Sequence, residues 1–156
     1  MSEADVEVKF YIDHVKVTVD KATDEVLKML AYRIVEGAQL NIRSNDQIDT
    51  GFMVNSIYPI WKEGSGYADA KAEAEQRTTG KDGRHVDHSD DMAPEPSLPG
   101  DASAGVVVGA NYAIYNEVRI PFLYPAAQKA VTEEQFRGEA EQIYREVLPN
   151  EGPGAK

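Results

Sequence analysis

The chain of 156 residues contains no cysteine, which excludes disulfide frameworks, thiol nucleophiles and cysteine-based zinc sites. It also lacks any run of about 18 apolar residues, the length that a membrane-spanning helix needs. The first residues are acidic at Glu3 and Asp5 and contain no apolar signal region. We therefore expect a soluble product of the cytoplasm that makes no membrane contact.

Positive charge is scarce, because 16 Lys and Arg residues face 27 Asp and Glu residues and leave a net charge of -11. This balance argues against a protein that grips DNA through its phosphates or binds anionic lipid. The length fits one domain with a single core, and it argues against an enzyme with a separate cofactor domain.

Hydrophobic periodicity predicts strands, then a long helix, in the first third of the chain. Residues 6–10 and 15–19 alternate with a period of two, and Asp13-His14 between them could turn a hairpin. Residues 21–43 then repeat at three and four and predict one helix. Its apolar stripe consists of Leu27, Leu30, Ala31, Ile34, Ala38 and Ile42. Gly37 lies inside this helix, so either the helix breaks there or another backbone packs close to it.

Two further strands are predicted at 56–61 and 105–109, and we expect them to be neighbours in one sheet. Pro59 predicts that the first of them lies at an edge or a bulge. Near the C-terminus, Pro125 is suited to open a helix. The stretch from Thr132 to Gln135 could form a capping box that starts a second helix, and Pro149 should end it.

Between these two strands lies an acidic segment. Residues 63–101 contain ten acids and four bases, a net charge of -6. The segment has few large apolar residues, although 68–76 could form two helical turns. We expect 63–103 to be a long, mobile insertion loop.

The triplet Asp49-Thr50-Gly51 matches the letters of the retroviral-type aspartic protease signature. That chemistry requires the triplet in a loop between strands of an all-β domain, whereas here it follows a long helix. The alternative is a turn that Gly51 permits and that Asp49 or Thr50 caps, and we favour this interpretation.

The stretch 85–91 holds two imidazoles, His85 and His88, and three carboxylates. These are enough ligand types for a divalent metal, but the polar surroundings favour a solvated loop. Neither a phosphate-binding G-x-x-x-x-G-K-[ST] loop nor G-x-G-x-x-G occurs in the chain. We expect no enzymatic activity, no cofactor and no resident metal.

Four features follow one another in a specific order. A helix leads to Asp49-Thr50-Gly51 and Ser56-Ile57, and then come a strand ending in Val108-Gly109, the stretch Tyr112-Ala113 with Glu117, and Pro121-Phe122-Leu123 with Pro125-Ala126. This order resembles the head-tail joining, or tail-completion, family of long-tailed bacteriophages. The resemblance spans about residues 22 to 147.

The resemblance implies an α+β fold, in which one long helix and a C-terminal helix pack on a twisted antiparallel sheet. It implies a single head-tail joining domain over 1–148. From the residues at and after Pro149 we expect a disordered tail at 149–156. The motif residues would be structural: Asp49, Thr50, Gly51, Ser56, Ile57, Val108, Gly109, Tyr112, Ala113, Glu117, Pro121, Phe122, Leu123, Pro125 and Ala126.

The resemblance also implies a function. Copies of the chain, about six of them, would form a non-catalytic ring at the neck of the virion, after synthesis in the host cytoplasm. Its partners would be the connector and the tail-tube or tail-terminator proteins. DNA would pass nearby without being specifically bound. The alternatives are another phage morphogenesis protein (connector adaptor, tail terminator or minor capsid component) and, less favoured, the protease or a metal-dependent enzyme.

Overall fold

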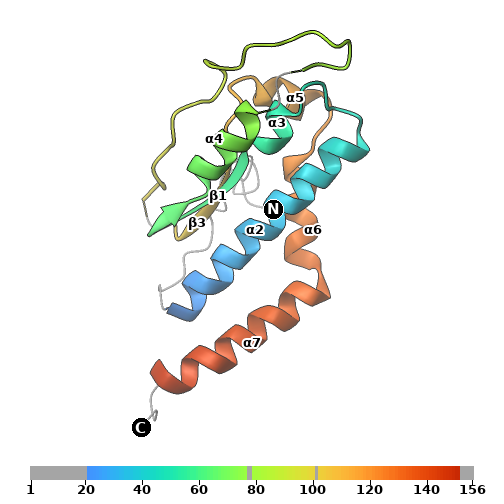
Figure 1. The fold of residues 1–156 in the computed structure, drawn as a ribbon. Helices are drawn as coiled ribbons and strands as arrows, with labels where there is room; N and C mark the ends of the chain where they lie inside the picture. Colours follow the sequence, from blue (N-terminus) through green and yellow to red (C-terminus); the bar gives the residue numbers. More distant parts are fainter. Residues whose placement is uncertain (1–20, 77–78, 101, 152–156) are drawn as a thin grey trace.

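The computed structural model describes residues 21–76, 79–100 and 102–151 and shows an α+β fold (Figure 1), which confirms the predicted class. The elements in chain order are α2 (Lys21–Ser44), α3 (Phe52–Asn55), β1 (Ile57–Trp61), β2 (Gly64–Ser65), α4 (Tyr67–Glu75), β3 (Ala104–Val108), α5 (Ala113–Arg119), α6 (Leu123–Thr132) and α7 (Glu134–Glu151). The predicted strands 6–10 and 15–19, with their turn, lie outside the described residues.

Helix α2 is the central support of the fold and confirms the helix predicted over 21–43. Every residue of its predicted apolar stripe is buried, and the helix contacts β1 and β3 as well as α6 and α7. Gly37 does not break it. Instead α6 packs there, so closely that a Cβ on Gly37 would lie 3.2 Å from the Cβ of Ala126. Neither α2 nor any other helix of the described ranges is long and apolar enough to cross a membrane.

The sheet is antiparallel, with strand order β2-β1-β3. Pro59 pairs with Val106 in the register, which confirms that the two predicted strands are neighbours. The expected edge position of Pro59 is wrong, because β1 is the middle strand of the described sheet. Its ring is tolerated because β2 pairs only with Ile60 and Trp61. Beside Pro59 the neighbouring residue is Gly66, which lies beyond the end of β2, and its N–H donates to the Pro59 carbonyl.

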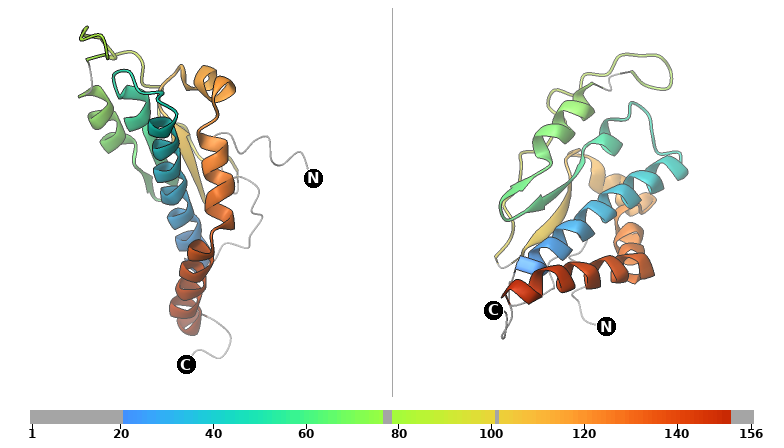
Figure 2. Two further views of the ribbon diagram at one scale, coloured as in Figure 1. Left: turned by 90° about the vertical axis from the view of Figure 1, so that its right-hand side faces the viewer. Right: turned by 60° about the horizontal axis from the view of Figure 1, so that its bottom comes forward.

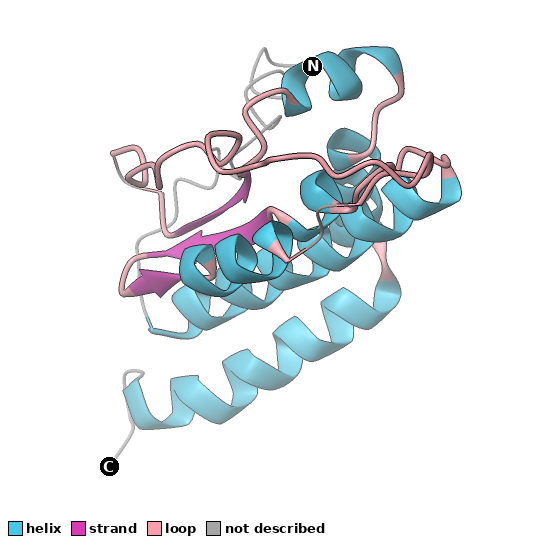
Figure 3. Ribbon diagram, turned by 45° about the horizontal axis from the view of Figure 1, so that its top comes forward, coloured by secondary structure: helices cyan, strands magenta, loops and turns pink. Residues whose placement is uncertain are grey.

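Both faces of the sheet are covered. One face packs on α2, and the other forms a smaller cluster of Tyr58, Ile60 and Val107 beneath Ala70 of α4. Leu98 and Met92 pack against the same cluster. The right view of Figure 2 shows α4 and the long connection on the side of the sheet away from α2, and Figure 3 shows the loops of this connection passing the strands on that side. The segment 63–103, expected as a long mobile insertion loop, is therefore in part a packed layer of the fold. The helical turns expected at 68–76 are confirmed as α4.

The C-terminal region forms two helices rather than one. Helix α6 starts at Leu123, two residues before Pro125, and ends where Glu133 takes an extended conformation. The second helix is confirmed, but the capping box is not formed, because the Thr132 hydroxyl donates back to Gln128 and Lys129 carbonyls. Helix α7 runs to Glu151, past the stop expected at Pro149, so the predicted tail begins too early. A proline removes one N–H, and near a helix end the backbone can continue for a short distance beyond it.

Replacing Gly37 by leucine should lower the free energy of unfolding by about 1 to 3 kcal/mol, because the added side chain must push α6 away from α2. The matched control is Gly138→Leu in α7, where no atom lies within 4 Å of an added Cβ. That change should raise stability by up to about 1 kcal/mol through helix propensity. Urea unfolding followed by circular dichroism measures both, and equal effects of the two variants would contradict the close α2–α6 contact.

Candidate functional site

The Asp-Thr-Gly triplet forms a turn between α2 and α3, as the turn interpretation predicts. Gly51 has φ of 87°, a left-handed conformation that costs glycine little and other residues more. The Phe52 N–H donates to Thr50 Oγ1 over 3.2 Å and closes the turn. The triplet therefore lies between two helices, not between the strands that an aspartic protease loop joins.

Asp49 binds the acidic segment rather than facing a second acid. Its Oδ1 accepts a hydrogen bond from the Lys81 N–H at 2.8 Å, and Gly80 packs against the same carboxylate. The Lys81 ammonium in turn lies 2.8 Å from Asp46 Oδ1, and this contact lowers the pKa of Asp46. The loop after α2 and the turn around residue 81 are thus held together at two points.

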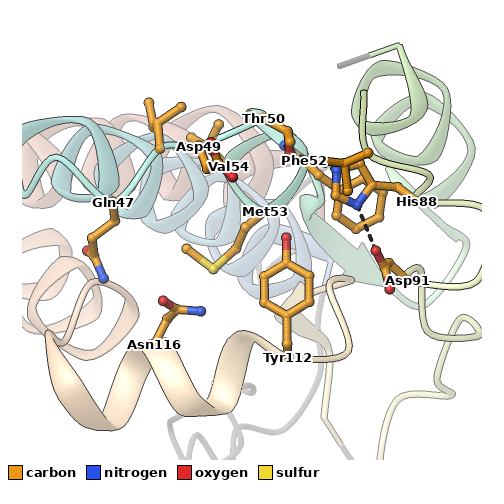
Figure 4. A pocket seen from close by; sticks show the side chains of 13 residues that line it. Gln47, Asp49, Thr50, Phe52, Met53, Val54, His88, Asp91, Tyr112 and Asn116 are labelled. Carbon is orange, nitrogen blue, oxygen red and sulfur yellow. Dashed lines mark hydrogen bonds and ion pairs between the residues drawn. The ribbon is translucent and has the colours of Figure 1, made fainter. Parts of the chain in front are cut away.

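Thr50 reaches the same segment through a buried histidine. Its Oγ1 lies 2.8 Å from His88 Nε2, and His88 Nδ1 lies 2.7 Å from Asp91 Oδ2 (Figure 4). The imidazole is only 6% exposed and stacks on Phe52, with ring centroids 4.4 Å apart. The solvated-loop interpretation is therefore wrong at His88. It holds at His85, which is exposed and meets Thr79 only through a backbone bridge.

A hydroxyl, an imidazole and a carboxylate in series are also the components of a nucleophilic triad. Here both ring nitrogens of His88 already have a partner, Nε2 in the Thr50 hydroxyl and Nδ1 in the Asp91 carboxylate. The Thr50 oxygen is tied from its other side by the Phe52 N–H. Thr50, His88 and Asp91 therefore join the turn to the acidic segment, and we call these three residues the clamp. No group of three or more metal-ligating side chains occurs in the described ranges, and His85 and His88 do not converge on one centre.

The clamp borders a pocket of about 360 Å³ that lies between the turn, the acidic segment and α5. Figure 4 shows the Tyr112 ring and the Asn116 side chain entering it from the α5 side, with Gln47 reaching it from the loop after α2. Burial raises the pKa of the Tyr112 phenol to about 12, and the carboxylates of Asp91 and Asp49 add to this effect. The phenol is therefore neutral at physiological pH, and it can donate a hydrogen bond in a negative environment.

Ser56 fastens α3 to the end of β3. Its hydroxyl donates to the Met53 carbonyl at 2.8 Å and accepts the Ala110 N–H at 3.0 Å, while its carbonyl accepts the Gly109 N–H. A Cβ on Gly109 would lie against the end of the Met92 side chain and 3.1 Å from the Ser56 carbonyl oxygen, so a larger residue here would have to displace Met92. The Val-Gly end of the strand and the serine of the motif are thus parts of one junction.

Glu117 caps helix α6. Its side chain is 5% exposed, and its two oxygens accept the N–H groups of Phe122, Leu123 and Tyr124 at 2.9 to 3.0 Å. The first four N–H groups of a helix have no partner within the helix. The fourth position here is Pro125, which has no N–H. One carboxylate and one proline therefore account for the whole N-terminus of α6.

The remaining motif residues have packing positions. Ile57 and Val108 face each other across β1 and β3, and both are buried. Ala113 is buried at the start of α5, and Ala126 makes the close approach to Gly37. Pro121 is exposed at the bend between α5 and α6. The structure thus gathers the motif into three junctions: the Asp-Thr-Gly turn, the Ser56 junction and the Glu117 cap.

Sequence reasoning missed the clamp and the cap, because each joins residues from different motifs. The spacing of His88 and Asp91 gave a signal, since residues three apart can contact each other in a turn, but nothing linked them to Thr50. For Glu117, the signal was an acid shortly before a Pro-containing helix start. A carboxylate at a helix N-terminus is favoured by unpaired N–H groups and by the helix dipole.

Glu117→Gln should lower the free energy of unfolding by about 1 to 3 kcal/mol. An amide supplies one acceptor oxygen, and its NH₂ group would face an N–H donor of α6. The control is Glu73→Gln, an exposed acid on α4, which should change stability by less than about 0.5 kcal/mol. Urea unfolding measures both, and equal stability of the two variants would refute the cap.

Thr50→Val keeps the shape of the side chain and removes the hydroxyl that binds His88. We expect faster amide hydrogen exchange within 79–91 and a loss of about 1 to 2 kcal/mol in stability. The control is Thr132→Val, because that exposed hydroxyl bonds only carbonyls of its own helix. Unchanged amide hydrogen exchange in 79–91 would show that the clamp does not hold this segment.

No family model, no curated protein and no solved structure matches this chain. Functional inference therefore rests on the motif residues and on their contacts in the fold.

Proposed function

We propose that this chain is a structural component of the neck of a long-tailed bacteriophage, where copies form a ring that joins the head connector to the tail tube. The proposal assigns it no catalytic role. It rests on the ordered motifs that resemble the head-tail joining family, from Asp49-Thr50-Gly51 to Pro125-Ala126.

The observation that carries the proposal is the Glu117 cap. The Tyr-Ala-x-x-x-Glu stretch and the Pro-Phe-Leu-x-Pro-Ala stretch are separate in the sequence, yet one hydrogen-bonded junction uses both. These residues match the family pattern and also form one hydrogen-bonded junction, which supports the proposal that the chain shares its architecture with that family. The same holds for Ser56, whose hydroxyl bonds the backbone just after Val108-Gly109.

The charge of the chain suits a ring that surrounds a DNA channel. A net charge of -11 gives phosphates no strong binding surface, so DNA would pass without being held. The partners we propose are further copies of the chain, the connector and the tail-tube or tail-terminator proteins. The virion neck is then its location after synthesis in the host cytoplasm.

The second candidate within the same class is another morphogenesis protein, such as a connector adaptor, a tail terminator or a minor capsid component. Copy number separates these positions, because an adaptor on the portal would be present in about twelve copies and a tail-side ring in about six. The protease and metal alternatives receive no support from the contacts of Asp49, His85 and His88.

The test is gold-labelled antibody against this protein, imaged by electron microscopy on intact particles from the source lysate. We expect label only at the head-tail junction. An antibody against the major capsid protein on the same grids provides the control for labelling of exposed epitopes. Particles without label, in a lysate that contains the protein in abundance, would refute the structural role.

A further inference from the structure

The surface of α5 carries the most exposed apolar side chains of the described chain. Tyr115 is 72% exposed and Val118 is 69% exposed, and Ile114 and Ile120 lie beside them in the sequence and are also exposed. We call these four residues the α5 patch. Large apolar side chains clustered at one site on a surface mark an interaction site more often than single ones do.

The charge of this region differs from that of the chain as a whole. Between 111 and 122 the only acid is Glu117, and its carboxylate is buried in the cap of α6. The exposed charge of the region is therefore Arg119 alone. Among the residues that the structure describes, Arg119 has no ion-pair partner. The α5 patch thus combines apolar surface with an uncompensated cation.

The complementary charge lies on another face of the same molecule. In the described part of 63–100, eight exposed acids face three exposed bases. The acids are Glu63, Asp69, Glu73, Glu75, Asp82, Asp87, Asp90 and Glu95, and the bases are Lys71, Lys81 and Arg84. Of these acids, Asp69, Glu73 and Glu75 lie on α4, and we call the exposed surface of α4 the acidic face.

The two surfaces are placed for contact between copies rather than within one. The left view of Figure 2 shows α5 on one side of the upper end of the molecule, and α4 on the other side. A contact between two different surfaces is heterologous, and repeated rotation closes such contacts into a ring. Burial of Ala70 and Ala74 keeps α4 in a fixed position for this role.

We infer that the α5 patch binds the acidic face of a second copy of this chain, with Arg119 meeting its carboxylates. The inference deepens the proposed function, because it names the subunit contact of the ring. Apolar burial at Tyr115 and Val118 supplies the affinity of the contact. Charge complementarity selects the acidic face and sets the orientation.

The first test measures self-association of the full chain by sedimentation velocity up to about 1 mM. We expect a mass that rises with concentration in the parent. Tyr115→Asp with Val118→Asp should weaken association at least about tenfold. The control is Val131→Asp on α6, a residue that is 51% exposed and lies outside the patch, and it should associate like the parent. A parent that stays monomeric, or equal weakening by the control, would overturn the inference.

The second test uses charge reversal to identify the partner surface. Arg119→Glu alone should weaken association. Mixing it with a chain that carries Asp69→Lys and Glu73→Lys should restore hetero-association, because each variant then supplies the charge that the other needs. Circular dichroism checks that each variant folds, since all three positions are exposed. Restored hetero-association supports the acidic face as the surface that binds the α5 patch. Folded variants that do not associate would reject this assignment.

These outcomes are separable from those of the particle test. Label at the neck, with association that ignores the α5 patch, would reject this contact alone. Particles without label, with association that depends on α5, would reject the neck location and keep the contact.

Discussion

The buried Glu117 carboxylate is the contact on which the arrangement of the helices depends. It fixes the N-terminus of α6 directly after α5, and α6 then places Ala126 against Gly37 of α2. Helix α2 in turn packs against β1 and β3. The bend between α5 and α6 therefore sets where α6 packs on the helix that supports the sheet. A buried charge is costly unless its hydrogen bonds are made. Three backbone donors meet this requirement, because both oxygens of the carboxylate accept N–H groups at the start of α6.

A second constraint arises from the sheet. β1 and β3 are buried along most of their length, and a sheet of this kind needs cover on both faces. Helix α2 covers one face. The other is covered by α4 with Met92 and Leu98, which belong to the segment between the two strands. The polar clamp at Thr50, His88 and Asp91 and the bond from Asp49 hold this layer at its far end. The insertion is therefore a structural layer whose outer surface remains acidic.

Periodicity in the sequence predicted α2, β1, β3 and their pairing, because these elements have long or dense apolar patterns. It did not predict the packed insertion, since Tyr67, Ala70 and Leu98 are isolated among polar residues and have no period. Val106-Val107-Val108 held the missing signal: an unbroken apolar run has no solvent face, so something must cover both sides. The clamp and the cap were beyond sequence reasoning because each depends on contacts between segments that only the fold brings together.

The pairing of β1 with β3 across the long connection has a consequence for how the chain folds. Trp61 pairs with Ala104, so the ladder closes a loop of about 40 residues before it gains its first hydrogen bond. The entropy cost of such a closure grows only with the logarithm of loop length, by about 0.6 kcal/mol per doubling. Lengthening the connection therefore lowers the stability of the native state only a little. The non-local pairing of β1 with β3 instead slows folding. The connection between β1 and β3 can therefore grow longer while the core formed by the two strands and α2 stays the same.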